Sequence, residues 1–138
     1  MIRGLQTGNA AFQAVQDLTN GCGKTAVPCV DSPGFVCNRI LVPMINEAAF
    51  TVFESVAPPE EVDTVMKLGA NHPMGPLKLA DMIGLDTILS VCEVLHREFG
   101  DQKYRPCPLL RLKVDAGHLG QKTGKGFYDY PAKPKSKL

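Results

Sequence analysis

The sequence lacks tryptophan, lacks a Cys-x-x-Cys pair and carries almost no net charge, with a formal value of +1. The three histidines have no ligand-like spacing, and the cysteines are odd in number: Cys22, Cys29, Cys37, Cys92 and Cys107. These features argue against a metal site or a disulfide framework, and they favour reduced, mostly buried thiols of an intracellular protein. A balanced charge also gives no field that would recruit nucleic acid or an anionic membrane.

A long uninterrupted apolar run is missing too. The most apolar stretch, residues 35–53, contains Asn38, Arg39, Asn46 and Glu47, which argues against a membrane span. The first residues, MIRGLQTGNA, show no apolar signal region and no Arg/Ser-rich transit pattern. What is present is 44% hydrophobic residues in a chain of 138, enough for one ordinary domain with a real core.

The longest predicted element is a helix over residues 34–55. Ser32 is a suitable N-cap, Pro33 suits the first helical position, and Pro43 is expected to kink the helix. Its apolar residues cover more than one face. Such a helix is expected either at the centre of the domain or in a subunit interface.

Four shorter helices are predicted after it. They span residues 59–68, 76–84, 86–99 with Asp86 as the cap, and 108–116, and glycines or prolines punctuate the connections. The end of the chain, GQKTGKGFYDYPAKPKSKL, is rich in Gly, Lys and Pro and is poorly suited to regular structure. We expect Phe127, Tyr128 and Tyr130 to pack there on the core.

Residues 1–31 differ in character from the rest. A helix is predicted over residues 9–20, and a short edge strand over residues 25–30, where Pro28 removes a ladder donor. A single helix and strand cannot bury their own apolar faces. The chain therefore divides into an α/β fragment (1–31), a helical domain (32–130) and a tail (131–138).

Two glycine-rich segments imitate nucleotide-binding motifs. The segment Gly21–Ala26 fits G-x-G-x-x-A, but the glycines follow a helix and precede a strand, which reverses the order that a dinucleotide site needs. The segment GHLGQKTGKG lacks the residues of a phosphate loop at two positions. We reject both, and leave open only that Lys122 or Lys125 lies near a ligand phosphate.

The chain ends in Ser136, Lys137 and Leu138, a tripeptide that a peroxisomal import receptor reads as an address. In a lysine-rich tail it could also arise by chance. We expect a peroxisomal location for a eukaryotic source, and otherwise a cytoplasmic or mitochondrial one.

Three motifs in order resemble one enzyme family. They are DSPGFVCNRILVPMINEAAFTVFE, DTVMKLGANHPMGPLKLADMIGLDT and GQKTGKGFYDY. Together they are similar to the C-terminal domain of L-3-hydroxyacyl-CoA dehydrogenases, including 3-hydroxybutyryl-CoA dehydrogenases. The resemblance implies an all-α domain of the 6-phosphogluconate dehydrogenase C-terminal-like type, which forms homodimers. It also implies that residues 1–31 are the last helix and strand of a Rossmann domain.

The resemblance assigns few functional residues to this sequence. It implies that Asn38 contacts substrate in the catalytic pocket, where an amide suits a carbonyl or hydroxyl oxygen. It implies, less specifically, that Asn71, Pro73 and Met74 belong to a loop that walls the acyl-CoA cleft. The family's catalytic histidine, its glutamate and its NAD loop have no counterpart in this sequence, so no residue is assigned to catalysis, to the cofactor or to a metal.

The resemblance therefore implies the C-terminal domain of an NAD-dependent L-3-hydroxyacyl-CoA dehydrogenase of fatty-acid β-oxidation. It would form the dimer and one wall of the acyl-CoA cleft, and would be inactive alone. A stand-alone acyl-CoA-binding or dimerisation module without catalysis is the alternative, as is one piece of a multifunctional β-oxidation enzyme.

Overall fold

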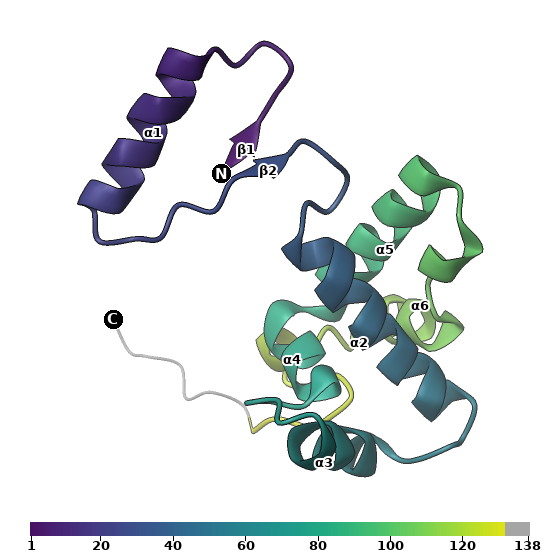
Figure 1. Ribbon diagram of the computed structural model, residues 1–138. Coiled ribbons are helices and arrows are strands. Elements are labelled where there is room, and N and C mark those ends of the chain that lie inside the picture. Colours follow the sequence, from purple (N-terminus) through teal and green to yellow (C-terminus); the bar gives the residue numbers. More distant parts are fainter. Residues whose placement is uncertain (132–138) are drawn as a thin grey trace, which may run out of the picture.

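The computed structural model describes residues 1–131, which form an α/β segment followed by a helical domain (Figure 1). The α/β segment consists of β1 (Ile2–Arg3), α1 (Asn9–Gly21) and β2 (Cys29–Val30). The helical domain consists of α2 (Cys37–Phe53), α3 (Pro59–Gly69), α4 (Pro76–Ile83), α5 (Leu85–Phe99), α6 (Pro108–Asp115) and two 3-10 turns, η1 (Gln102–Tyr104) and η2 (Gln121–Thr123). The prediction of an all-α domain of about five helices behind a helix–strand piece is confirmed.

The α/β segment lies to one side of the helices and buries little of its own surface (Figure 1). β1 and β2 pair in parallel, with Ile2 opposite Cys29, so the strand predicted over residues 25–30 is confined to its last residues. No residue of α1 is buried, and Leu18 is 67% exposed. The segment therefore presents apolar surface that nothing within residues 1–131 covers.

The domain is built around α2, which packs against α3, α4, α5 and α6. The helix continues past Pro43 to Phe53. The core combines one side of α2 with the inner faces of its neighbours; its buried members are Val42, Ile45, Ala48, Ala49, Val62, Leu77, Ala80, Leu85, Ile88, Cys92, Cys107, Leu110 and Phe127. The buried amide of Asn46 accepts from the Cys107 N–H at 2.8 Å and donates to the Arg105 carbonyl at 2.9 Å, which fixes the α5–α6 connection to α2.

Apolar residues of α2 also stay exposed outside the core. Ile40, on the side away from the buried residues, is 67% exposed, and Phe53 and Val56, at and just beyond the end of the helix, are 46% and 71% exposed. The prediction that apolar residues cover more than one face of this helix is confirmed. Large apolar side chains in such positions are typical of a surface that another protein covers.

The cysteine prediction is only partly right. All five thiols are free, but Cys22 and Cys37 are exposed and only Cys92 and Cys107 are buried. Cys22 lies just after α1, a helix with no buried residue, and Cys37 lies at the exposed start of α2. Burial raises the pKa of the Cys92 thiol to about 12, so this side chain acts as a small apolar core residue.

Candidate functional site

Asn38 lines a hollow of about 230 Å³ between the start of α2 and one side of α5. We call it the Asn38 hollow; its lining residues are Gly34, Phe35, Asn38, Thr87, Ser90, Val91, Val94 and Leu95. Asn38 is exposed, and within residues 1–131 its amide makes no hydrogen bond. It therefore has both a free donor and a free acceptor for a ligand oxygen.

A turn before α2 shapes this hollow. The helix begins at Cys37, so the predicted start with Ser32 as the cap is wrong. Gly34 and Phe35 instead adopt left-handed conformations, with φ of 74° and 48°. A Cβ on Gly34 would lie 2.8 Å from Leu95 Cδ2 and 3.1 Å from the Arg39 backbone N, so glycine avoids a crowded contact with α5 here. The left-handed region is strained for phenylalanine, and such outliers concentrate at functional sites.

The loop between α3 and α4 lines a different hollow, of about 310 Å³. Pro73 and Met74 lie in its wall together with Asp63, Lys78 and Tyr128. Neither residue lines the Asn38 hollow, so the structure does not bring them together with Asn38. Their contact with substrate stays a prediction.

Asn71 lines neither hollow and has a local role. It follows the end of α3 with φ of 52°, a conformation that asparagine tolerates better than other side-chain-bearing residues. The His72 N–H donates to the Met66 carbonyl at 3.3 Å across the same turn. The conformation explains an asparagine here without a ligand, and its predicted substrate contact stays a prediction.

Two buried aspartates join α3, α4 and the chain end. Asp63 accepts from the backbone N–H groups of Leu77 and Lys78 at 2.8 and 2.9 Å, and so caps α4 from a distance. Asp81 accepts from the N–H groups of Phe127 and Tyr128, both at 2.9 Å. Each carboxylate therefore replaces water with backbone donors, which makes its burial tolerable.

Two tyrosines complete this network. Tyr128 donates to Asp63 at 2.8 Å, and Tyr130 donates to Asp81 at 3.0 Å. Burial and the adjacent carboxylates raise the pKa of both phenols. The Lys78 ammonium lies 4.7 and 4.6 Å from the two ring centroids. The expected packing on the core is confirmed for Phe127 and Tyr128, whereas Tyr130 contacts Asp81 and Lys78 instead.

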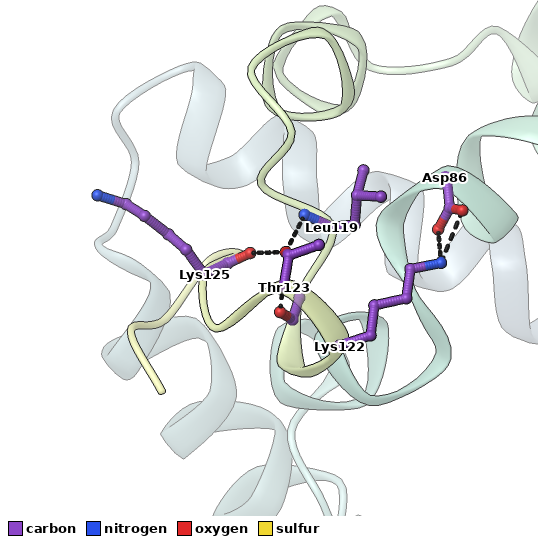
Figure 2. A network of polar contacts seen from close by, with 6 residues as sticks. Asp86, Leu119, Lys122, Thr123 and Lys125 are labelled. Carbon is purple, nitrogen blue, oxygen red and sulfur yellow. Dashed lines mark hydrogen bonds and ion pairs between the residues drawn. The ribbon is translucent and has the colours of Figure 1, made fainter. Parts of the chain in front are cut away.

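Figure 2 shows how the glycine-rich segment around η2 is attached to the start of α5. The Lys122 ammonium donates to both Asp86 carboxylate oxygens, at 2.6 and 2.7 Å. Thr123 Oγ1 accepts from the Leu119 N–H at 2.9 Å and donates to the Lys125 carbonyl at 3.1 Å (Figure 2). Asp86 lies in the first turn of α5 and makes no N-cap bond there, so its predicted cap role is wrong.

The hydrogen bond from Lys122 holds the pKa of the Asp86 carboxyl below its usual value. A group with a lowered folded-state pKa stabilises the fold above its unfolded pKa of about 4, and this contribution is lost as pH falls through the lowered value. We expect Lys122→Met to reduce the free energy of unfolding by about 0.5 kcal/mol at pH 7. Urea unfolding at pH 7 and pH 3 should show the difference shrink at the lower pH. A difference in unfolding free energy between the native chain and Lys122→Met that does not change with pH would contradict a stabilising Lys122–Asp86 ion pair.

A third hollow, of about 510 Å³, runs between α2 and α3 and is almost entirely apolar. Met44, Ala48, Val62, Val65 and Met66 form much of its wall. Glu47 and Glu61 supply its charged groups. We call it the α2–α3 groove.

The remaining features offer little for a cofactor or an ion. Gly21, Cys22 and Gly23 come at the C-terminal end of α1 and do not precede a helix, so residues 1–131 form no dinucleotide cradle. Within the same residues no group of three or more His, Cys, Asp or Glu side chains is placed to hold a metal. None of the helices between residues 1 and 131 combines the length and hydropathy of a membrane span.

The fold and the Asn38 hollow define a helical domain preceded by a small α/β segment, with an open and mostly apolar site that holds one amide at the start of α2. Residues 34–130 match the family model described as 3-hydroxyacyl-CoA dehydrogenase, C-terminal domain. The chain belongs to this family.

Relatives and solved structures agree with this membership. The chain is 62% identical over 133 residues to a probable 3-hydroxybutyryl-CoA dehydrogenase of Bacillus subtilis, covering 96% of the chain and 46% of the relative. It matches the crystal structure of (S)-3-hydroxybutyryl-CoA dehydrogenase PaaH1 from Ralstonia eutropha with a TM-score of 0.92 and 58% identity, over 94% of this chain and 46% of that one. FadB2 of Mycobacterium tuberculosis matches with a TM-score of 0.92, 41% identity and the same coverage.

The chain thus spans about half the length of the relatives that it matches. Because the Ralstonia match covers 94% of the chain, it includes most of the α/β segment as well as the helices.

Proposed function

We propose that the chain is the helical half of an NAD-dependent L-3-hydroxyacyl-CoA dehydrogenase of fatty-acid β-oxidation. It supplies one wall of the acyl-CoA cleft. The observation that carries the proposal is the Asn38 hollow, which offers a free amide beside the α/β junction. Among the described residues, no His, Asp, Glu, Lys, Tyr or Cys lines this hollow, so it holds a ligand oxygen without a group to move its proton.

In this proposal Asn38 orients the oxygen on carbon 3 of the acyl group. A neutral amide N–H stabilises partial negative charge on such an oxygen and needs no change of protonation. The general base and the NAD site belong to the other half, since the described residues fit neither. The chain alone would therefore be inactive.

The proposal is tested in a chimera in which this chain replaces the matching region of the Bacillus subtilis relative. We expect the chimera to reduce acetoacetyl-CoA with NADH, and the chain alone to leave NADH unchanged in the same assay. Reduction by the purified chain alone would overturn the proposed division of labour. A chimera that folds and binds NADH but leaves acetoacetyl-CoA unreduced would overturn the proposed activity.

The α2–α3 groove supports a second part of the proposal, a homodimer formed by the helical domain. Apolar grooves beside exposed apolar residues are typical of surfaces that a second subunit covers. Val65 lines this groove and is 65% exposed. The dimer would bury such side chains, which the monomer leaves in water.

We expect Val65→Glu to convert the dimer into a monomer, because a buried carboxylate without a partner costs several kcal/mol. Sedimentation equilibrium should give twice the 14.9 kDa mass of the chain before the change and a single mass after it. Leu112→Glu is the matched control, since Leu112 is 60% exposed on α6 and lines none of the three hollows. A native chain that sediments as a monomer would contradict the dimer.

The peroxisomal address stays a prediction, because residues 136–138 lie outside the described residues. Bacteria have no peroxisomes, and the relative with 62% identity is bacterial, which argues against the address.

A further inference from the structure

Arg39 follows Asn38 in the first turn of α2, and its exposed guanidinium lies against an aromatic ring. Within residues 1–131 no carboxylate pairs with it. Its Cζ atom instead lies 4.2 Å from the centroid of the Phe99 ring, inside the range of about 6 Å over which an aromatic face attracts a cation. Because Phe99 is the last residue of α5, this contact joins the start of α2 to the end of α5. The C-terminal end of a helix also favours a cation.

The Phe99 ring is itself held by a buried neighbour. Its centroid lies 5.2 Å from that of the Tyr104 ring, and Tyr104 is buried. Gly100 ends α5 directly after Phe99 in a left-handed conformation, and η1 then brings Tyr104 back to the ring. The surface on which Arg39 rests is therefore fixed to the domain.

The first turn of α2 has few other contacts that hold it. No side chain caps the helix, and its first buried residue is Val42. The Arg39 N–H donates to the Gly34 carbonyl at 3.2 Å. The Ile40 N–H donates to the Val36 carbonyl at 3.3 Å, and both bonds are longer than the usual value of about 2.9–3.0 Å. Within the described part of the chain, Arg39 alone among residues of this turn contacts another element through a side-chain hydrogen bond, ion pair or cation–π contact.

The start of α2 meets α5 along one stripe of that helix. Gly34 approaches Leu95, and Arg39 lies over Phe99, about one helical turn further on. Val91, about one turn before Leu95, lines the hollow. The stripe that forms a wall of the hollow therefore also receives the two residues on either side of the bend into α2.

We propose that Arg39 is a positioning residue, whose contact with Phe99 holds the first turn of α2 so that the amide of Asn38 faces the hollow. Adjacent residues of a helix point about 100° apart, so the rotation that places Arg39 over the ring also fixes the direction of Asn38. The inference rests on the proposed function, because that function gives Asn38 a substrate oxygen to orient. Arg39 acts through Asn38 and does not touch the substrate.

The contact is tested first in the chain itself, by the hydrogen-exchange rate of the Ile40 amide measured by NMR. This amide is protected only while the first turn of α2 is formed. Arg39→Met removes the charge, and Phe99→Leu removes the ring without changing the sequence near Ile40. An exposed cation–π contact changes an equilibrium by about two- to fivefold, so we expect both variants to speed exchange by about that factor.

The consequence for Asn38 is tested in the chimera described above. Both variants should lower kcat for acetoacetyl-CoA by up to about the same factor, with KM nearly unchanged, because fewer molecules hold Asn38 in place. The double variant should lose no more than either single one, since each removes the same contact. Phe99→Tyr keeps the ring and should keep the rate.

Arg97→Met is the matched control for Arg39→Met. Arg97 is also an exposed arginine, lies on α5, pairs with Glu98 at 3.0 Å and does not line the hollow. Its variant should leave both the Ile40 exchange rate and kcat unchanged. Thermal unfolding of each variant checks that folded protein is being compared.

A direct contact between Arg39 and the substrate would give a different result. If the guanidinium bound a phosphate of coenzyme A, Arg39→Met would raise KM for acetoacetyl-CoA but not for acetoacetyl-pantetheine, which has no phosphate. That result would overturn the positioning role and leave the proposed function standing, as would an Ile40 exchange rate that is unchanged in both folded variants. If the unchanged chimera binds NADH but reduces neither thioester, the proposed function falls, and the role of Arg39 falls with it.

Discussion

Replacing Gly126 by alanine is expected to destabilise the chain by about 3 kcal/mol or more. A Cβ at this position would clash with Asp81 Oδ1, far inside contact distance. The buried carboxylate would have to move, and it would lose the N–H groups of Phe127 and Tyr128 and the Tyr130 hydroxyl. A buried charge without its donors is among the most costly defects in a folded protein. Urea or thermal unfolding measures the loss.

The matched control for this prediction is Gly69→Ala. Gly69 ends α3 without a left-handed backbone, and a methyl group added to it would meet nothing within 4 Å, so alanine should change the stability by less than about 1 kcal/mol. Asp81→Asn offers a second test of the same contact. Asparagine keeps the shape of the side chain, but its NH₂ group would face backbone N–H or tyrosine O–H donors where the carboxylate accepted hydrogen bonds. We therefore expect Asp81→Asn to destabilise the fold as well. A Gly126→Ala variant as stable as the native chain would contradict the role assigned to Asp81.

Replacing Asn38 by alanine in the chimera is expected to lower kcat for acetoacetyl-CoA by about 10²- to 10³-fold. That is the usual loss when one preorganised donor to a developing oxyanion is removed. Because the described residues give the Asn38 side chain no hydrogen-bond partner, its loss should leave the fold intact. The effect should therefore appear in steady-state rates while the melting temperature stays nearly constant.

Cys37→Ala is the matched control for Asn38→Ala. Cys37 is also exposed in the first turn of α2, but it does not line the hollow. Its variant should keep the rate of the unchanged chimera. If Asn38→Ala also keeps the rate of the unchanged chimera, Asn38 does not contact the substrate in the cleft.

Patterns of apolar residues were sufficient to predict most of the helical domain. The helices α3, α4 and α6 begin at Pro59, Pro76 and Pro108, where proline fixes the first helical position. The excess of apolar residues on α2 correctly indicated a helix with more than one apolar side. Periodicity works at these points because burial of one helix face depends on local spacing along the chain.

The parts that could not be predicted depend on contacts between distant residues. Asp63 and Asp81 look like ordinary surface charges in sequence, and only the fold brings them to donors more than ten residues away. An aspartate within the apolar run LADMI, followed much later by the aromatic run FYDY, was the available signal. The strand β1 has two residues and no pattern, so only its pairing with β2 defines it.

The start of α2 was mispredicted for a similar reason. Ser32 and Pro33 form a good local helix signal, but the close approach of α5 to Gly34 favours a left-handed turn there. The tertiary contact overrides the capping preference of the sequence. The same turn places Phe35 and Asn38 in the wall of one hollow, so the mispredicted helix start lies at the candidate site.

The most direct test of the account is the rate at which the chimera reduces acetoacetyl-CoA with NADH, compared with the rate of the Bacillus subtilis relative. If this chain supplies the dimer surface and the Asn38 wall of such an enzyme, the two rates should agree within about tenfold, a difference of about 1.4 kcal/mol in the barrier. A chimera that folds, dimerises and binds NADH but shows no measurable reduction would contradict the account.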